Sequence, residues 1–154
     1  MAETHKQPPQ PSMSIRMNAT LQITQWNGQQ IAARTAAIVE AYGQALEQQL
    51  QEEIKTIQFD WPRETKRKNG QMVTSPRDIV DLGGFLRSQE LQNTGQTSRR
   101  FVWNAPYAST IFSGYTTNRG TPVPGRDWMT PALRALPPAR FFAQEWRRLA
   151  GGQP

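Results

Sequence analysis

The chain has 154 residues but no cysteine, and its only histidine is His5. Without thiols it forms neither disulfide bonds nor thiolate metal sites, and their absence indicates synthesis in the cytoplasm or in another reducing compartment. His5 lies in a Pro- and Gln-rich stretch that we expect to be disordered, which excludes histidine general-base catalysis and histidine-ligated metal. The residue types that most often act as nucleophile, base or metal ligand are therefore scarce.

Apolar residues are also few, at 36% of the chain. No apolar run approaches the roughly 18–20 residues that a membrane span needs. The N-terminal sequence MAETHKQPPQPSM lacks the apolar core of a signal peptide. We therefore expect no membrane partner and no export. A low apolar content also suits a domain that buries part of its surface against partner subunits.

The net charge of +6 is unevenly distributed along the chain. Residues 1–62 carry four Lys/Arg and six Asp/Glu, a balance of −2, whereas residues 63–154 carry fourteen and six, a balance of +8. A basic half of this kind is typical of contact with nucleic acid. A solubilising or subunit-pairing surface explains it equally well, and the sequence leaves both alternatives open.

Composition and periodicity indicate a single domain. Residues 1–16 are rich in Pro, Gln and Ser and predict a disordered tail, residues 17–150 form the domain, and residues 151–154 form a short tail. The alternation in Thr20–Thr24 predicts a short strand, and Asn27 with Gln30 resembles a capping box at the start of a helix.

The clearest element is a long helix from Gly28 to about Gln58. Its apolar residues recur at helical spacing and form one stripe, which predicts packing onto a sheet. These residues are Ile31, Ile38, Tyr42, Leu46, Leu50, Ile54 and Ile57. Gly43 weakens the middle of the helix, and a close approach to a packed neighbour would explain it.

Shorter elements follow. A β-hairpin is predicted across residues 87–104, with Phe101 and Trp103 on its core face rather than stacked on bases. Residues 106–114 predict two helical turns that end at Gly114.

Two helices are predicted at the C-terminus. Thr130 caps the first, with Pro131 at its first position, and Pro137-Pro138 ends it before a last helix over Ala139–Ala150. The fold class is α+β: a long N-terminal helix packed on a small antiparallel sheet, with short C-terminal helices.

Residues 62–77 form a basic segment between two prolines, with a turn signal at Asn69-Gly70. We expect a mobile loop or a loose hairpin. Three interpretations remain open: an arm laid over a neighbouring subunit, a loop that contacts DNA phosphates, or a solvated loop.

No motif for catalysis or phosphate binding is present. Asp78 and Asp81 are the only carboxylate pair worth testing, and Asp81 is better explained as a cap of the turn at Gly83-Gly84. GTPVPGR contains glycine and proline but lacks the spacing of a phosphate-binding loop. We expect no enzymatic activity and no cofactor.

Three segments, in the order RDIVDLGGFLRSQ, VWNAPYASTIFSG and GRDWMTPALRAL, resemble the head–tail joining (tail-completion, neck or minor tail) proteins of tailed bacteriophages. Asp81, Gly83 and Arg87 match the first family segment, although Leu82 stands where the family has Thr. Pro106-Tyr107-Ala108 matches the second and Arg126–Ala132 the third.

The resemblance implies a structural virion protein, made in the host cytoplasm, that forms a ring in the phage neck. Such a ring, a hexamer or a dodecamer, joins the portal or connector to the tail terminator or tail tube protein. Genomic DNA passes through its channel without sequence specificity. A small basic protein that binds DNA without sequence choice is the alternative.

The irregular segment from Tyr115 to Arg126, with the aromatic and arginine residues around it, is expected to contact neighbouring subunits. The candidate residues are Tyr107, Phe112, Tyr115, Arg119, Pro122, Arg126 and Trp128. The basic candidates for the channel or an inter-ring surface are Arg63, Lys66, Arg67, Lys68, Arg99 and Arg100.

Overall fold

The structure is a computed structural model that describes residues 13–18 and 28–151. The predictions for the strand Thr20–Thr24, for the cap at Asn27 and for residues 1–12 lie outside the described residues. Helix and small antiparallel sheets combine in an α+β arrangement, as the sequence predicts.

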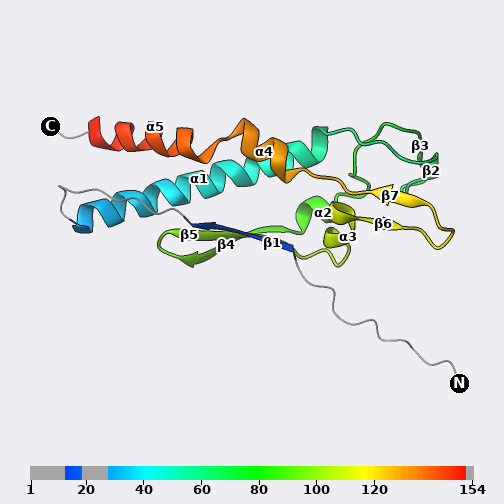
Figure 1. Ribbon diagram of the computed structural model, residues 1–154, viewed down its shortest axis with the longest axis horizontal. Coiled ribbons are helices and arrows are strands. Elements are labelled where there is room, and N and C mark those ends of the chain that lie inside the picture. The colour runs from blue at the N-terminus through cyan, green and yellow to red at the C-terminus, as the bar shows by residue number, and fades with distance from the viewer. Residues whose placement is uncertain (1–12, 19–27, 152–154) are drawn as a thin grey trace, which may run out of the picture.

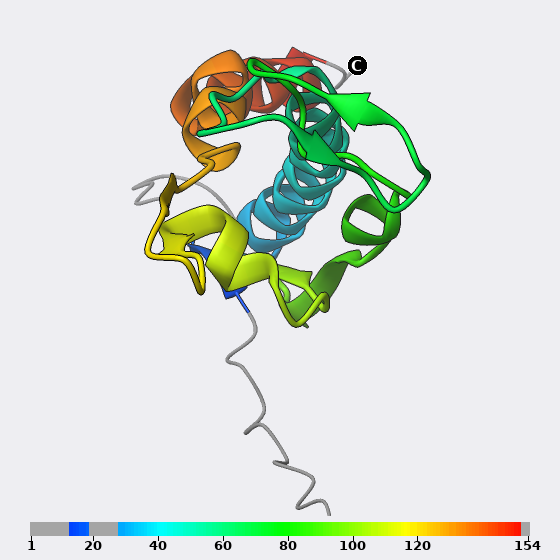
Figure 2. The same ribbon diagram turned by 90° about the vertical axis from the view of Figure 1, so that its right-hand side faces the viewer.

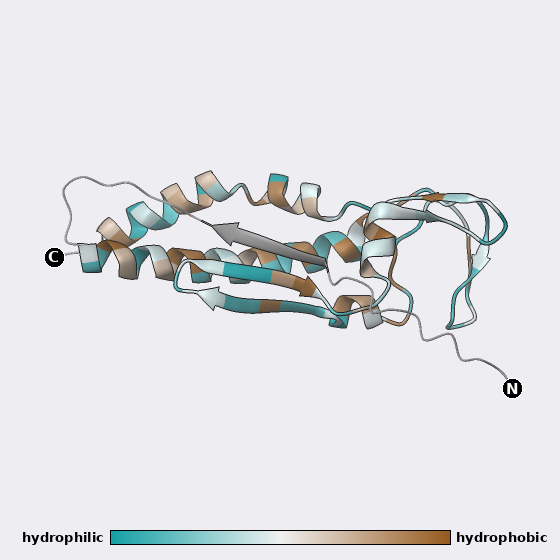
Figure 3. Ribbon diagram, turned by 60° about the horizontal axis from the view of Figure 1, so that its bottom comes forward, coloured by the Kyte–Doolittle hydropathy of each residue, from teal (hydrophilic) through white to brown (hydrophobic). Residues whose placement is uncertain are grey.

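A long helix forms the centre of the molecule. Helix α1 (Gly28–Thr56) lies between a sheet on one side and two C-terminal helices, α4 (Met129–Ala135) and α5 (Pro138–Gly151), on the other (Figure 1). Helix α1 is therefore packed on two faces, and Figure 3 shows apolar and polar residues alternating along it. Helix α5 includes Gly151, the first residue of the predicted C-terminal tail.

The main sheet is antiparallel, with strand order β1-β5-β4. Strand β4 (Gln89–Gly95) and strand β5 (Ser98–Trp103) form the predicted hairpin, which is confirmed. Strand β1 (Met13–Asn18) pairs with the other edge of β5. The predicted tail 1–16 is therefore wrong from Met13 onward, because backbone pairing with β5 supplies order that composition does not reveal.

The remaining short elements gather at one end of the molecule, which we call the hairpin end. Figure 2 looks onto this end and shows its two hairpins and two short helices around the end of α1. The elements are β2 (Thr65–Lys66), β3 (Met72–Val73), α2 (Gly84–Arg87), α3 (Ala108–Ser113), β6 (Gly114–Thr116) and β7 (Pro122–Pro124). Strands β2 and β3 pair with each other, so the basic segment 62–77 contains a hairpin, one of the two predicted forms.

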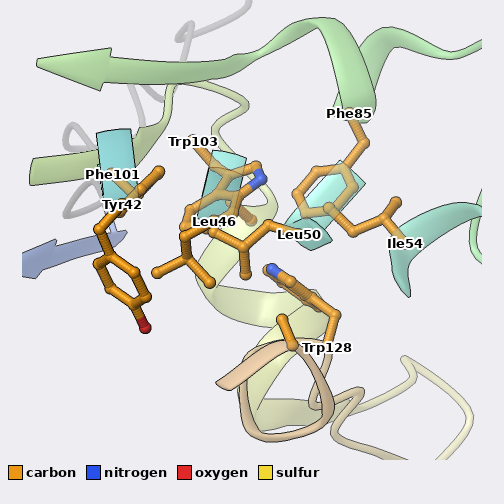
Figure 4. Packing of buried hydrophobic residues seen from close by; sticks show 10 residues of the cluster. Tyr42, Leu46, Leu50, Ile54, Phe85, Phe101, Trp103 and Trp128 are labelled. Atoms are coloured by element: carbon orange, nitrogen blue, oxygen red, sulfur yellow. The ribbon is translucent and has the colours of Figure 1, made fainter. Parts of the chain in front are cut away.

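The core lies between α1 and the elements on both of its sides. Leu46, Leu50 and Ile54 are fully buried against aromatic residues of the sheet and the hairpin end (Figure 4). Phe101 and Trp103 of β5 are also fully buried, which confirms their predicted place on the core face.

Gly43 brings α1 close to the sheet. A Cβ at this position would lie 3.3 Å from Cγ of Arg99 and 3.4 Å from Cδ2 of Leu91. Such contacts are tighter than ordinary van der Waals packing, so a side chain there would press on β4 and β5. Close packing is thus the reason for a glycine inside the long helix.

The start of α4 differs from its prediction. The helix begins at Met129, so Thr130 lies inside it and does not cap it, and Pro131 is its third residue. The carboxylate of Asp127 accepts hydrogen bonds from the backbone N–H groups of Met129 and Thr130, both at 2.9 Å. Burial acts to raise the pKa of Asp127, but a hydrogen bond from the Thr130 side chain, the two backbone bonds and the charge of Arg134 together hold the pKa below its usual value.

Leu50 tests the central position of α1. Leu50→Ala is expected to lower the free energy of unfolding by about 2–5 kcal/mol, because it removes fully buried methyl groups and leaves a cavity. Leu133→Ala is the matched control on exposed surface of α4 and is expected to change stability by about 0.5 kcal/mol or less. Urea unfolding measures both, and equal losses would contradict this assignment of the core.

Candidate functional site

The hairpin end exposes most of the large apolar side chains that the described surface carries. Met72 is 55% exposed, Leu82 56%, Tyr107 45% and Tyr115 41%. These residues come from two parts of the sequence, Met72 with Leu82 and Tyr107 with Tyr115. Exposed apolar residues that gather on one surface are typical of a protein–protein contact, whereas scattered ones need no explanation.

Leu82 and Tyr107 border a cavity of about 470 Å³, which we call the Leu82 groove. Its lining includes Ile79, Phe85 and the aliphatic part of the α2 region, with the charged residues Lys68 and Arg87 beside them. The ring centres of Phe85 and Tyr107 lie 6.3 Å apart, so the exposed tyrosine rests on a buried aromatic residue. An apolar floor with a charged rim is the usual composition of a protein interface.

The structure brings all seven predicted subunit-contact residues to the hairpin end, but not all to its surface. Tyr107, Tyr115, Arg119 and Pro122 are exposed. Phe112 is half-buried against Trp128, with ring centres 5.3 Å apart.

Trp128 is fully buried. It therefore has no surface to offer to a neighbouring subunit, and the sequence prediction for it is wrong. The reason is that its ring packs against other aromatic residues, which no local sequence pattern reveals.

Trp128 joins the three segments that carry the family resemblance. Its indole makes edge-on contacts with Phe85 at 5.0 Å, with Trp103 at 5.5 Å and with Phe112 at 5.3 Å between ring centres. Phe85 belongs to the first segment, Trp103 and Phe112 to the second, and Trp128 to the third. Aromatic residues from the three segments thus form one cluster at the base of the hairpin end.

The β6–β7 hairpin depends on a close backbone approach. Gly114 has φ 81°, and a Cβ there would lie 2.6 Å from the backbone nitrogen of Gly125. Gly125 in turn faces the carbonyl of Phe112 with no room for a Cβ. Gly114 ends α3 as predicted, and it also allows the chain to return directly into β6.

The basic candidates do not form a single patch. Arg63, Lys66 and Lys68 are exposed in and beside the β2–β3 hairpin. Arg67 is half-buried and pairs with the carboxylate of Asp78 at 2.8 Å. Three of the four basic residues predicted here are therefore free to meet an anion at the surface.

Arg99 was expected at a DNA channel or inter-ring surface, and the structure contradicts this. Its guanidinium is buried between α1 and the sheet, where Nε donates to Glu40 Oε2 at 2.8 Å and Nη2 forms an ion pair with the same carboxylate. Arg100 is half-buried on β5. Figure 1 shows the β4–β5 turn next to them at the opposite end from the hairpin end.

Asp78 and Asp81 both have structural partners. Asp78 pairs with Arg67 and accepts the backbone N–H of Val80 at 2.8 Å. Asp81 accepts a hydrogen bond from the backbone N–H of Lys68 at 2.9 Å, so it connects the β2–β3 hairpin to the residues before α2. Its predicted role as a cap of the Gly83-Gly84 turn is replaced by this contact.

Two arginine side chains, Arg77 and Arg126, lie over the ring of Trp61, a cluster that the sequence did not predict. The guanidinium carbons of Arg77 and Arg126 lie 3.6 Å and 4.3 Å from the centre of the Trp61 ring. Arg126 is only 2% exposed, so a partner reaches it only through a cavity that it lines with Trp61. Because the three residues are distant in sequence, no spacing rule identifies the cluster.

The described residues contain neither a metal-ligating cluster nor a membrane-spanning helix. Over residues 13–18 and 28–151, no cluster of three or more His, Cys, Asp or Glu side chains is placed to hold a metal ion. Within the same part of the chain, no helix combines the length and apolarity needed to cross a membrane.

The Glu40–Arg99 pair makes stability depend on pH. The hydrogen bond from Arg99 is the main cause that holds the pKa of Glu40 below its usual 4.5. A lowered pKa stabilises the fold above the unfolded pKa, and this contribution is lost as pH falls through the folded pKa. Glu40→Gln is therefore expected to reduce urea resistance at pH 7, with a difference from wild type that shrinks below pH 4.5.

The control for this pair is Glu52→Gln, which removes an exposed carboxylate from the same helix. It is expected to leave the urea midpoint nearly unchanged at both pH values. A loss for Glu40→Gln that stays constant from pH 7 to pH 3 would show that the charge of Glu40 does not contribute.

Comparison with protein-family models, curated proteins and solved structures finds no significant match to this chain. The family resemblance therefore rests on the three sequence segments alone.

Proposed function

We propose that this chain is a structural virion protein that forms an oligomeric ring in the neck of a tailed bacteriophage. The ring joins the portal or connector to the tail and surrounds the DNA channel. One observation carries the proposal: the three segments that resemble the head–tail joining family meet in the aromatic cluster around Trp128. They act together as a support for an exposed, irregular surface.

The hairpin end has the composition of a subunit contact. Leu82, Tyr107 and Tyr115 expose apolar area there, beside exposed Arg119. Aromatic and arginine residues contribute much of the binding free energy in protein interfaces. Residues 115–126 are not the irregular segment expected from the sequence but largely the β6–β7 hairpin, whose exposed turn carries Arg119.

A closed ring needs two different patches, one on each side of the subunit. The hairpin end supplies the first patch. The α4–α5 layer is the candidate for the second, because α5 has no fully buried residue and Leu133 of α4 is exposed. Figure 1 shows that α5 extends away from the hairpin end, so the two patches lie on different parts of the molecule.

Leu82→Asp tests the ring. A charge in the Leu82 groove opposes burial against a neighbour, so the variant is expected to stay monomeric where wild type assembles. Sedimentation velocity and negative-stain images measure assembly, for the chain alone and with portal and tail proteins. Because Leu82 is exposed, the urea midpoint of the variant should remain close to wild type.

Gln96→Asp is the control, since it adds the same charge in the exposed β4–β5 turn. It is expected to assemble as wild type does. Wild-type chain that forms no ring under any of these conditions contradicts the proposed function. A Leu82→Asp ring of wild-type size shows that the groove is not the contact.

A second candidate function, DNA binding without sequence choice, is favoured by the three exposed cations of the basic hairpin. Arg63, Lys66 and Lys68 are positioned to contact phosphates at the surface. In the ring they would line the channel or an inter-ring surface, and in a DNA-binding protein they would supply affinity directly.

Replacement of Arg63, Lys66 and Lys68 by alanine tests this candidate. If each contacts a phosphate, the triple variant lowers the slope of log K against log salt by about 3. Fluorescence anisotropy with a DNA duplex between 50 and 200 mM salt measures the slope. Wild-type binding that does not change over this range would exclude DNA binding as the main function.

A further inference from the structure

Two buried arginines beside Trp61 lack a counter-ion in the described structure. Nη1 of Arg126 donates to the carbonyl of Pro124 and Nη2 to the carbonyl of Asp60 at 3.3 Å. The buried Nε of Arg126 and that of Arg77 have no hydrogen-bond partner among the described residues. Every acceptor that Arg126 uses is thus a neutral carbonyl.

Two other buried or half-buried arginines are neutralised by carboxylates of the chain. Arg99 pairs with Glu40 and Arg67 pairs with Asp78. Asp78 is also the carboxylate that acts on Arg77, but its hydrogen bond goes to Arg67. Arg67 and Arg77 therefore share one carboxylate, and no carboxylate of the described residues pairs with Arg126.

Burial of this charge has a measurable cost. Burial is the main cause that lowers the pKa of both Arg77 and Arg126, and repulsion from Arg67 and Arg126 lowers that of Arg77 further. The cation–π contacts with Trp61 offset part of the cost, but an indole carries no charge. A buried arginine without a counter-ion is stabilised when an anion binds to it.

Arg126 and Trp61 line a cavity of about 300 Å³, which we call the Trp61 cavity. Tyr107, Thr110 and Tyr115 add hydroxyl groups, and most of the remaining wall is apolar. A neighbouring cavity of about 160 Å³ shares Trp61 and is lined by Arg67 and Arg77 together with Asp78 and Asp81. The phenol of Tyr115 is near enough to raise the pKa of both Arg77 and Arg126, so it belongs to the same site.

We propose that the Trp61 cavity binds a side-chain carboxylate from a second copy of this chain. A guanidinium fork matches a carboxylate in geometry, and the tyrosine hydroxyl at the rim can donate as well. Arg126 is 2% exposed, so the ligand has to enter on a slender apolar stem. A phosphate on the rigid surface of a duplex cannot do this.

The charge distribution indicates where the carboxylate comes from. From Gly28 to Pro62 the chain carries five Asp/Glu and two Lys/Arg, a balance of −3, so a contact between α1 of one copy and the Trp61 cavity of the next brings opposite charges together. Glu47 and Glu52 of α1 have carboxylates with no side-chain partner among the described residues, and they are the assigned ligands. This assignment rests on the proposed function, because it requires contact between copies.

The first experiment tests the cavity without requiring a ring. Full-length chain labelled with ¹⁵N is titrated with sodium acetate at constant ionic strength, and the arginine Nε–H signals are followed by NMR. The signals of Arg126 and Arg77, assigned with Arg126→Lys and Arg77→Lys, are expected to shift and saturate. Shifts that only follow total salt overturn the proposal, even if rings form.

Tyr115→Phe keeps the exposed ring and removes only its hydroxyl, so it tests the site without the risk of unfolding a buried arginine variant. It is expected to weaken acetate binding about 2–10-fold, the value of one hydrogen bond. Arg119→Lys, in the exposed turn of the β6–β7 hairpin, is the control and should leave acetate binding unchanged. Unchanged binding in Tyr115→Phe removes the hydroxyl from the site and overturns its stated composition.

The second experiment identifies the occupant. Unlabelled chain added to labelled chain is expected to shift the same two signals, and unlabelled Glu47→Gln/Glu52→Gln chain is expected to shift them much less. Glu90→Gln is the control from β4 and should act as wild type. Equal shifts from all three chains overturn the assignment to α1, and stronger shifts with a DNA duplex than with the chain overturn a carboxylate ligand. Saturable acetate binding without self-association contradicts the ring but leaves the cavity in place.

Discussion

The indole of Trp128 has no exposed surface, and it touches aromatic residues from three other parts of the chain. Edge-on contacts of this kind add about 0.5–1.5 kcal/mol each to the free energy gained by burial. The larger consequence is geometric. With Trp128 in place, α2, α3 and the start of α4 have fixed positions against β5 and α1, so the irregular segments between them leave the core at defined points.

Helix α1 makes this arrangement possible because it is packed on two faces. One face meets the sheet, where Gly43 allows contact with β4 and β5, and the other meets α4 and α5, where the Tyr42 hydroxyl donates to the carbonyl of Leu136 at 3.0 Å. A chain with only 36% apolar residues thus concentrates its core along one helix. The β2–β3 and β6–β7 hairpins add no residue to that core cluster, and they expose Met72 and Tyr115.

Periodicity predicted the elements of regular structure well, because the stripe of α1 and the alternation around Phe101 and Trp103 are local signals. It failed where a partner is distant in sequence. The sequence suggests that Arg99 and Arg126 are exposed cations. In the structure, however, Arg99 is buried in an ion pair with Glu40, and Arg126 is buried against the Trp61 ring and two backbone carbonyls. Trp128 shows the same limit, because the residues next to it in the sequence do not indicate whether its ring is buried or exposed.

A buried arginine that is paired with a carboxylate of its own chain has a structural role, whereas a buried arginine without a counter-ion is a candidate for binding a partner. Arg99 is paired within the chain and locks α1 onto the sheet, so its role is complete in the monomer. Arg126 is even less exposed but contacts only two carbonyls and an indole, and Arg77 shares the carboxylate of Asp78 with Arg67. Removal of charge from water without a counter-ion is unfavourable for a chain on its own, and it becomes favourable once a carboxylate arrives. An assembly of identical subunits supplies that carboxylate only when the next copy is in place, so the same cluster that weakens the monomer would strengthen the ring.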